Sequence, residues 1–448
     1  MKRISIGIVL SVLILTIVLL GLSSALLATQ GGSRWVLKQV PGLTVQGWRG
    51  ALLSQWHAEE LLWENDDMRV QINQAHMSLS PSCLLRSTLC LDALTAARIE
   101  LQLPESMPTN EPAQGIELPD LQLPLSIEVG EVRVDEFSLN GESLVSHAEL
   151  RASWVEEGIY ISEFALQYQE YKVNVTGSIM PSLGWPVDLQ VNAYVPVPDA
   201  PALDVVAQLT GSLQNLNLVA ATQGYAAAQL KGQVQALDVN VPAQISIKLA
   251  DFKATPDLPD TLTVADLALE LQGDLQKGYH VDGLGVLSST ADKMELSLTA
   301  LVQTTEARLQ SLRLSANEKA FVAVQGVAHW KNELTADVQL QWQDFPWHQL
   351  LQQEEVPVQL QRLTGQVSYA TGQYQGQIDG DLLGPAGPFT LLTSFFGNEQ
   401  KIELSEFLLE AGQGRLLGTA TVGFAQGLEW LADVQASQLD PAYWLAEL

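Results

Sequence analysis

The chain has 448 residues, of which 47% are hydrophobic and only 17% charged, and its formal net charge is -28. Ordinary soluble domains carry roughly 25% charged residues, so neutral polar side chains must supply much of the surface, and the high apolar fraction excludes a disordered chain. The negative charge argues against nucleic acid as a partner, because neutralising phosphates requires Lys and Arg.

The first predicted element is a membrane anchor at residues 1–30. Residues 4–28 contain no charged residue, and a helix needs about 20 residues to cross a bilayer. Lys2 and Arg3 precede this segment, which predicts a cytoplasmic N-terminus and a body on the far side of the membrane. A cleaved signal peptide is the alternative, but its apolar region spans only about 7–15 residues. The positions expected within the membrane include Ile4, Leu10, Leu15, Leu20 and Ala28.

The chain contains two cysteines, Cys83 and Cys90. A low, even number of cysteines at close spacing is typical of one disulfide in an oxidising compartment, which the far side of a bacterial inner membrane provides. Two buried thiols are the alternative that the sequence leaves open. No histidine lies next to them, which argues against a zinc site.

From about residue 42 onward, apolar and polar residues alternate in many short segments. Such alternation predicts β-strands with one apolar face, and sheets of this kind are usually antiparallel. The expected fold class is therefore all-β, with a single N-terminal transmembrane helix followed by an elongated antiparallel sheet. Short helices are expected only at residues 33–40, 346–354 and 440–447, too few to cover the apolar face. The sheet must then fold over on itself as a sandwich, a barrel or a curled trough.

The alternating apolar residues support two interpretations. They form either the dry core of a sandwich or the lining of a groove that takes up acyl chains. The length of the body, the scarcity of helices and the membrane anchor favour the groove. The candidate lining residues are Val70, Ile72, Ile127, Val129, Leu189, Val191, Leu267, Leu269, Leu271, Leu296, Leu298, Leu312, Leu314, Val338 and Leu340.

Glycine and proline mark the organisation of this body. An apolar-x-Gly element recurs at uneven spacing, which predicts units of one or two hairpins in which glycine allows a bulge or a bend. Five prolines lie within residues 103–124, which predicts a loop at 104–124. The recurring glycines are Gly177, Gly211, Gly232, Gly273, Gly326, Gly365 and Gly418.

No motif for catalysis is found. The six histidines are scattered along the chain without metal-ligand spacing, and no nucleophile elbow, phosphate-binding loop or dinucleotide fingerprint occurs. The sequence therefore predicts no catalytic residue, no metal and no cofactor, and a protein that is not an enzyme.

Several segments, in order, resemble TamB proteins, the inner-membrane subunits of the translocation and assembly module, which belong to the AsmA-like group of bridge-type lipid transfer proteins. The resemblance spans the chain, and the segments that carry it include residues 47–53 (GWRGALL), 77–85 (MSLSPSCLL), 164–169 (FALQYQ) and 439–444 (LDPAYW). It implies a chorein-like region at 31–103 where lipid enters, followed by the loop at 104–124. A repetitive β-groove at 125–448 comes next, curled and open along one side (a "β-taco").

The resemblance also implies a function. It predicts transport of phospholipids from the inner toward the outer membrane, with the body in the periplasm. The implied partner is the outer-membrane barrel protein TamA, with a role in assembling outer-membrane proteins such as autotransporters. TamB proteins are longer and contact the barrel through a C-terminal domain, so we expect this chain to be the N-terminal portion of a longer protein. A chaperone or scaffold that accepts client strands at a sheet edge, without moving lipid, is the alternative function.

Overall fold

The structure is a computed structural model in which two compact units follow each other along the chain, Met1–Ala220 and Ala221–Leu448. Most of the predicted anchor, including Ile4, Leu10, Leu15 and Leu20, lies outside the described residues, as do residues 104–117 of the proline-rich loop. In the part of the chain that is described, no helix has the length and apolar character needed to cross a membrane. The described residues are 26–65, 68–103, 118–121, 123–198, 200–254, 259, 261–289, 292–331, 333–351, 358–424, 428–438, 440 and 443.

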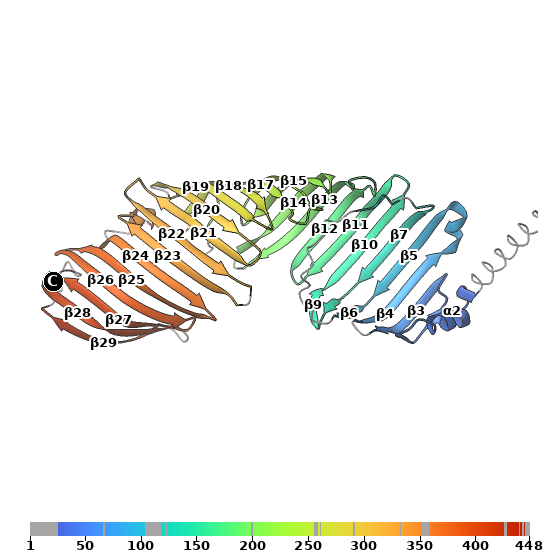
Figure 1. Cartoon of the computed structure of the whole chain (residues 1–448), viewed down its shortest axis with the longest axis horizontal. Helices are drawn as coiled ribbons and strands as arrows, with labels where there is room; N and C mark the ends of the chain where they lie inside the picture. The colour runs from blue at the N-terminus through green and yellow to red at the C-terminus, as the bar shows by residue number, and fades with distance from the viewer. Residues whose placement is uncertain are drawn as a thin grey trace, which may run out of the picture. The chain divides into compact units, whose positions relative to one another are not determined.

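Unit 1 is built almost entirely from strands, which lie side by side in a single layer (Figure 1). Its described helices are α2 (Gln30–Leu37) and the 3-10 helix η1 (Pro81–Arg86). Its strands are β1 (Leu43–Gln46), β2 (Arg49–Gly50), β3 (Gln55–Glu64), β4 (Arg69–Ser80), β5 (Thr88–Ala96), β6 (Arg98–Gln102), β7 (Ser126–Val134), β8 (Phe137–Leu139), β9 (Glu142–Val145), β10 (His147–Val155), β11 (Gly158–Tyr168), β12 (Tyr171–Ile179), β13 (Pro186–Val197) and β14 (Ala200–Ser212).

Strand β15 (Asn215–Gly224) contains the boundary between the units. Unit 2 again consists of strands in one layer (Figure 1), with one described helix, α3 (Trp347–Leu351). Its strands are β16 (Ala228–Val234), β17 (Ala243–Leu249), β18 (Thr263–Asp274), β19 (Gly278–Ser288), β20 (Lys293–Val302), β21 (Glu306–Ser315), β22 (Phe321–His329), β23 (Thr335–Gln343), β24 (Gln359–Ala370), β25 (Gln373–Gly384), β26 (Gly387–Asn398), β27 (Lys401–Ala411), β28 (Gly414–Gly423) and β29 (Glu429–Ser437). The described residues confirm a mostly β chain with few helices.

In unit 2, each strand from β16 to β29 pairs antiparallel with the next strand of the chain. In unit 1, the same hairpin order runs from β10 to β14. Antiparallel neighbours can be joined by tight turns. The prediction of an antiparallel sheet therefore holds for most of the described strands.

The prediction is wrong at one place in unit 1, where β5 pairs parallel with β7 and β6 pairs parallel with β8. Parallel neighbours need a long crossover connection, and the chain between Gln102 and Ser126 supplies it. The alternation of apolar residues is the same whichever way a strand runs, so the sequence pattern carries no signal of this reversal.

Helix α2 is fixed to the first strands. The Thr29 side chain accepts a hydrogen bond from the backbone N–H of Gly32 at 3.2 Å, which caps the helix three residues earlier than the predicted start at 33. The fully buried Ser33 hydroxyl donates to the Leu27 carbonyl at 3.0 Å and accepts from the Leu52 N–H at 2.9 Å. Next to it, the rings of Trp48 and Trp56 stack with centroids 4.9 Å apart and form the centre of a small core.

Candidate functional site: an apolar face on each unit

The most extensive feature of unit 2 is an apolar face that continues from strand to strand. Directly paired residues of neighbouring strands point to the same side of a sheet, so the pairing identifies which residues share a face. One row of paired residues crosses nine strands: Leu230, Ile247, Leu269, Gly283, Leu298, Leu312, Val324, Leu340 and Gly365. Further rows on the same side pair Leu296 with Leu314, and pair Leu271 with Ile245 and Val281.

All nine candidate lining residues of unit 2 lie on this face. Gly285 pairs with Leu296 and therefore belongs to this face. A Cβ added at Gly285 would lie 3.1 Å from a Leu267 methyl carbon, so the Leu267 side chain lies on the same face. Val338 joins it through its pairing with Gly326, which lies two residues from Val324. Strict alternation therefore assigned these residues to one side of the sheet.

The six candidates of unit 1 also share one face. Val129 and Leu189 belong to a row that passes through Ala152, Ile161 and Gly177, and Val191 belongs to the adjacent row. The neighbouring positions are Ile127, which lies two residues from Val129, and the pair Val70 and Ile72 on β4. Ile72 packs against the Trp48–Trp56 core together with Met77, whose row leads through Leu94 to Val132 on β7.

Strict alternation fails at several points in the described strands of unit 1, three of which lie on β4, β3 and β7. The apolar side moves by three residues from Ile72 to Ala75 on β4, where Gln74 has a positive φ of 53°. A three-residue step also separates Ala58 from Leu61 on β3, and both residues pack at the Trp48–Trp56 core. On β7 the step runs from Val129 to Val132, where the pairing with β10 shifts by one residue. Extra residues of this kind re-aim the side chains of a strand, and here they keep apolar residues on one side.

The apolar face is only half-buried. All fifteen candidate residues keep intermediate exposure, whereas a sandwich core would bury them fully. The chain exposes 28433 Å² of surface, against roughly 17,000 Å² for a globular protein of this mass. Much of the apolar surface that a globular core would remove from water is therefore still accessible.

The recurring glycines lie on the apolar face. A Cβ at Gly326 would lie 2.5 Å from the Asp337 carbonyl oxygen of the next strand. At Gly177, where φ is +135°, the distance to the Asp188 oxygen would be 2.1 Å. Glycine thus allows adjacent strands to approach closely. Gly365 differs, because the nearest atoms would lie at an ordinary 3.8 Å.

Helix α3 covers one end of the apolar face of unit 2. Phe345 and Leu350 form a buried cluster with Leu262 and Met294, and face residues such as Leu314 pack against it. The observed helix, Trp347–Leu351, lies within the predicted range 346–354. Just before it, the Phe345 ring lies edge-on to Trp342 with 5.3 Å between the ring centroids. Elsewhere the face carries the polar hydroxyl of Tyr279, which donates a hydrogen bond to the Val241 carbonyl at 2.7 Å. Burial raises the pKa of this phenol.

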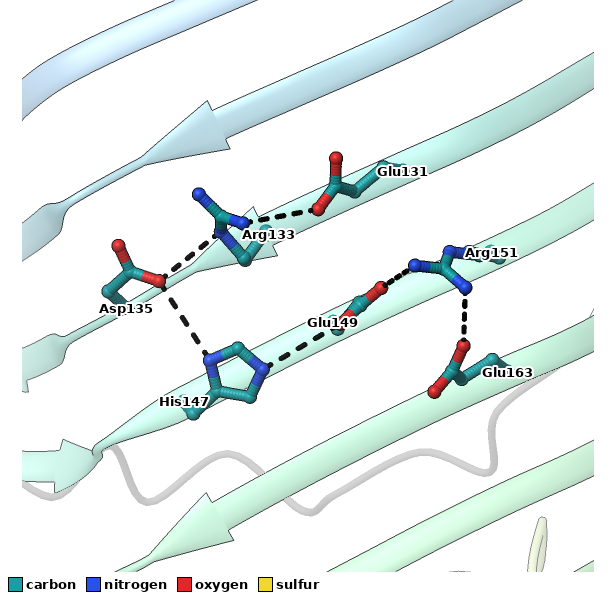
Figure 2. A network of polar contacts seen from close by, with 7 residues as sticks. All are labelled: Glu131, Arg133, Asp135, His147, Glu149, Arg151 and Glu163. Atoms are coloured by element: carbon teal, nitrogen blue, oxygen red, sulfur yellow. Dashed lines mark hydrogen bonds and ion pairs between the residues drawn. The ribbon is translucent and has the colours of Figure 1, made fainter.

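The opposite face is polar. Figure 2 shows a network in unit 1 that links Glu131, Arg133, Asp135, His147, Glu149, Arg151 and Glu163 across β7, β10 and β11. Arg151 bridges two strands, with a guanidinium nitrogen 2.9 Å from a Glu163 oxygen. Their strand neighbours Val132 and Leu150 point to the apolar side. Apart from Glu149, these side chains are partly exposed, and ion pairs between exposed groups contribute little stability, so the network mainly marks the polar face.

A similar polar cluster lies on unit 2. The Arg362 guanidinium donates to Asp381 at 2.6 and 3.2 Å and to Asp379 at 3.1 Å. These hydrogen bonds stabilise the charged carboxylate and hold the pKa of Asp381 below its usual value. Among the described residues, no group of three or more His, Cys, Asp or Glu side chains is placed to hold a metal ion.

Each unit by itself is thus a β-sheet with an apolar face and a polar, partly charged face, and with few helices among its described residues. The chain matches the family model described as TamB, N-terminal domain, over residues 19–117 and 113–379, and it belongs to this family. The resemblance seen in the sequence is therefore confirmed. No solved structure matches the chain.

Proposed function

We propose that the apolar faces of the two units conduct phospholipids from the inner toward the outer membrane. The observation that carries this proposal is the continuity of each face: paired rows of aliphatic residues run across many strands and stay half-exposed. Each methylene group moved from an apolar environment into water costs about 0.8 kcal/mol. An acyl chain that stays against such a face avoids this cost, so the face lowers the barrier to transfer.

In this proposal, residues 1–30 anchor the chain in the inner membrane, with the N-terminus in the cytoplasm and the body in the periplasm. Residues 31–103 receive lipid, and the strands of 125–448 carry the acyl chains with the head groups in water. Lipid delivery supports outer-membrane assembly, including that of autotransporters. The barrel protein TamA is the proposed partner, contacted by a C-terminal part of a longer protein.

The test is a pair of variants at adjacent residues of β20. Leu298 points to the apolar face, whereas Ser297 points to the polar face and pairs with Arg313. We expect Leu298→Glu to abolish co-purification of phospholipid and its transfer between vesicles, because a carboxylate interrupts the apolar row. Ser297→Glu is the matched control and should bind and transfer lipid normally. Normal transfer by Leu298→Glu, confirmed at Leu269→Glu, would refute conduction.

A further inference from the structure

A loop near the start of unit 1 presents two leucines to solvent. Leu85 is 92% exposed and Leu84 is 53% exposed, both on the 3-10 helix η1. Their neighbour Cys83 is buried and forms a disulfide with Cys90 of β5. The two adjacent leucines give η1 an exposed apolar tip, of the kind that can enter an apolar environment.

The disulfide directs these leucines away from the apolar face. Cys90 pairs with Glu128, and its sulfur lies 3.7 Å from a Glu128 oxygen, so it points to the polar side of the sheet. Its neighbour Leu89 pairs with Ile127 on the apolar side. The crosslink therefore holds η1 at the polar side, where Leu84 and Leu85 cannot cover the apolar residues of β5.

The loop lies next to the place where the chain leaves the predicted anchor. The Leu27 carbonyl, at the end of that segment, accepts a hydrogen bond from the Leu53 N–H at 3.2 Å. The adjacent Ser54 carbonyl accepts from the Leu79 N–H at 2.6 Å, and Ser80 directly precedes η1. Two hydrogen bonds therefore connect the end of the anchor to the start of η1, which places Leu84 and Leu85 close to the membrane that holds the anchor.

The charge of this region matches a phospholipid surface. Residues 31–58, which follow the anchor, contain three basic residues (Arg34, Lys38 and Arg49) and no acidic residue, although the whole chain has a net charge of -28. Arg86 adds a further positive charge on η1 itself. Basic residues beside apolar ones are typical of segments that bind phospholipid head groups.

We propose that η1 inserts Leu84 and Leu85 into the outer leaflet of the membrane that holds the anchor, with Arg86 at the head-group phosphates. The loop then acts as a second attachment point that keeps the first strands of the apolar face against the lipid surface. This inference rests on the proposed membrane anchor and on the lipid role of the apolar face.

The test uses the full-length chain in vesicles of phosphatidylethanolamine and phosphatidylglycerol, with photo-reactive p-benzoyl-phenylalanine in place of Leu85. The matched control carries the probe in place of Leu183, which is 88% exposed in the turn between β12 and β13. This turn lies at the same ends of the strands as η1, because the pairing leads from Leu89 through Ile127 and Trp154 to Ile179. It is four strand spacings away from β5, about 19 Å.

We expect the yield of lipid adduct to be at least five-fold higher at position 85 than at position 183. Equal or lower yield at position 85 would overturn the insertion of the loop. Flotation of the vesicles checks that every variant is in the membrane. Cys83→Ser with Cys90→Ser should lower the yield at position 85 to that at 183, and an unchanged yield would overturn the role of the disulfide.

A third probe at Leu298 separates this proposal from lipid conduction. Adduct at 298 without adduct at 85 would overturn the insertion of η1 and leave conduction standing. Adduct at 85 without adduct at 298 would support insertion and count against conduction.

Discussion

Two glycines of the apolar face should respond in opposite ways to the same substitution. At Gly365 an added methyl group would lie 3.8 Å from its nearest atoms, and the backbone conformation there suits any residue. Gly365→Ala should therefore stabilise unit 2 by about 0.5 kcal/mol, because alanine lowers the conformational entropy of the unfolded chain. At Gly326 the methyl group would lie 2.5 Å from the Asp337 oxygen. The strands must then separate, and overpacking of this kind costs about 1–3 kcal/mol.

Thermal unfolding of the full-length chain in detergent, followed by the circular dichroism of the strands, measures the difference. One kcal/mol shifts the melting temperature of a unit of this size by about 2–4 °C, so Gly365→Ala should melt roughly 3–14 °C above Gly326→Ala. Equal melting temperatures, or the reverse order, would refute the argument that Gly326 marks a close approach of strands. Gly365→Phe extends the test, because its ring should obstruct lipid transfer without introducing a charge.

Three further predictions concern other parts of the fold. Replacing Cys83 and Cys90 with serine removes a crosslink across a short loop and should cost about 2–3 kcal/mol, while thiol labelling of the unreduced wild type should modify neither cysteine. Trp48→Ala empties the core beneath α2 and should cost about 3–5 kcal/mol; a small change in melting temperature would contradict this. Arg362→Gln removes the partner that lowers the pKa of Asp381, and since both side chains are partly exposed the loss at pH 7 should be below about 1 kcal/mol. A carboxyl with a lowered pKa stabilises the fold above its unfolded pKa of about 3.9, so the difference from wild type should shrink as the pH falls below 4 and should not grow.

The side of the sheet on which the apolar residues lie was the feature that sequence reasoning located best. In unit 2, Leu269, Leu298, Leu312 and Leu340 come from four strands that the sequence treats separately, yet the pairing places them in a single row. Each strand carries its own alternation, and a sheet with one polar face must bring the apolar sides together.

Sequence reasoning missed the features that depend on contacts between distant segments. The apolar exposure of η1 could have been sought in the sequence, since Leu84 and Leu85 lie between the two cysteines. The outward direction of these residues follows only from the disulfide and from the pairing of Cys90 with Glu128. The polar network around Arg133 and Arg151 likewise forms only when β7, β10 and β11 are adjacent.

The sequence by itself therefore determined the all-β class, the family and the apolar side of most strands, because an alternation of period two is a local property of the chain. The tertiary structure decided the parallel pairing of β5 with β7, the three-residue steps at Gln74 and Gly130, and the division within β15. It also decided at which glycines the backbones of adjacent strands approach closely. These properties depend on which strand lies beside which and in what register, and the same alternation is compatible with either direction and with every register that differs by two residues.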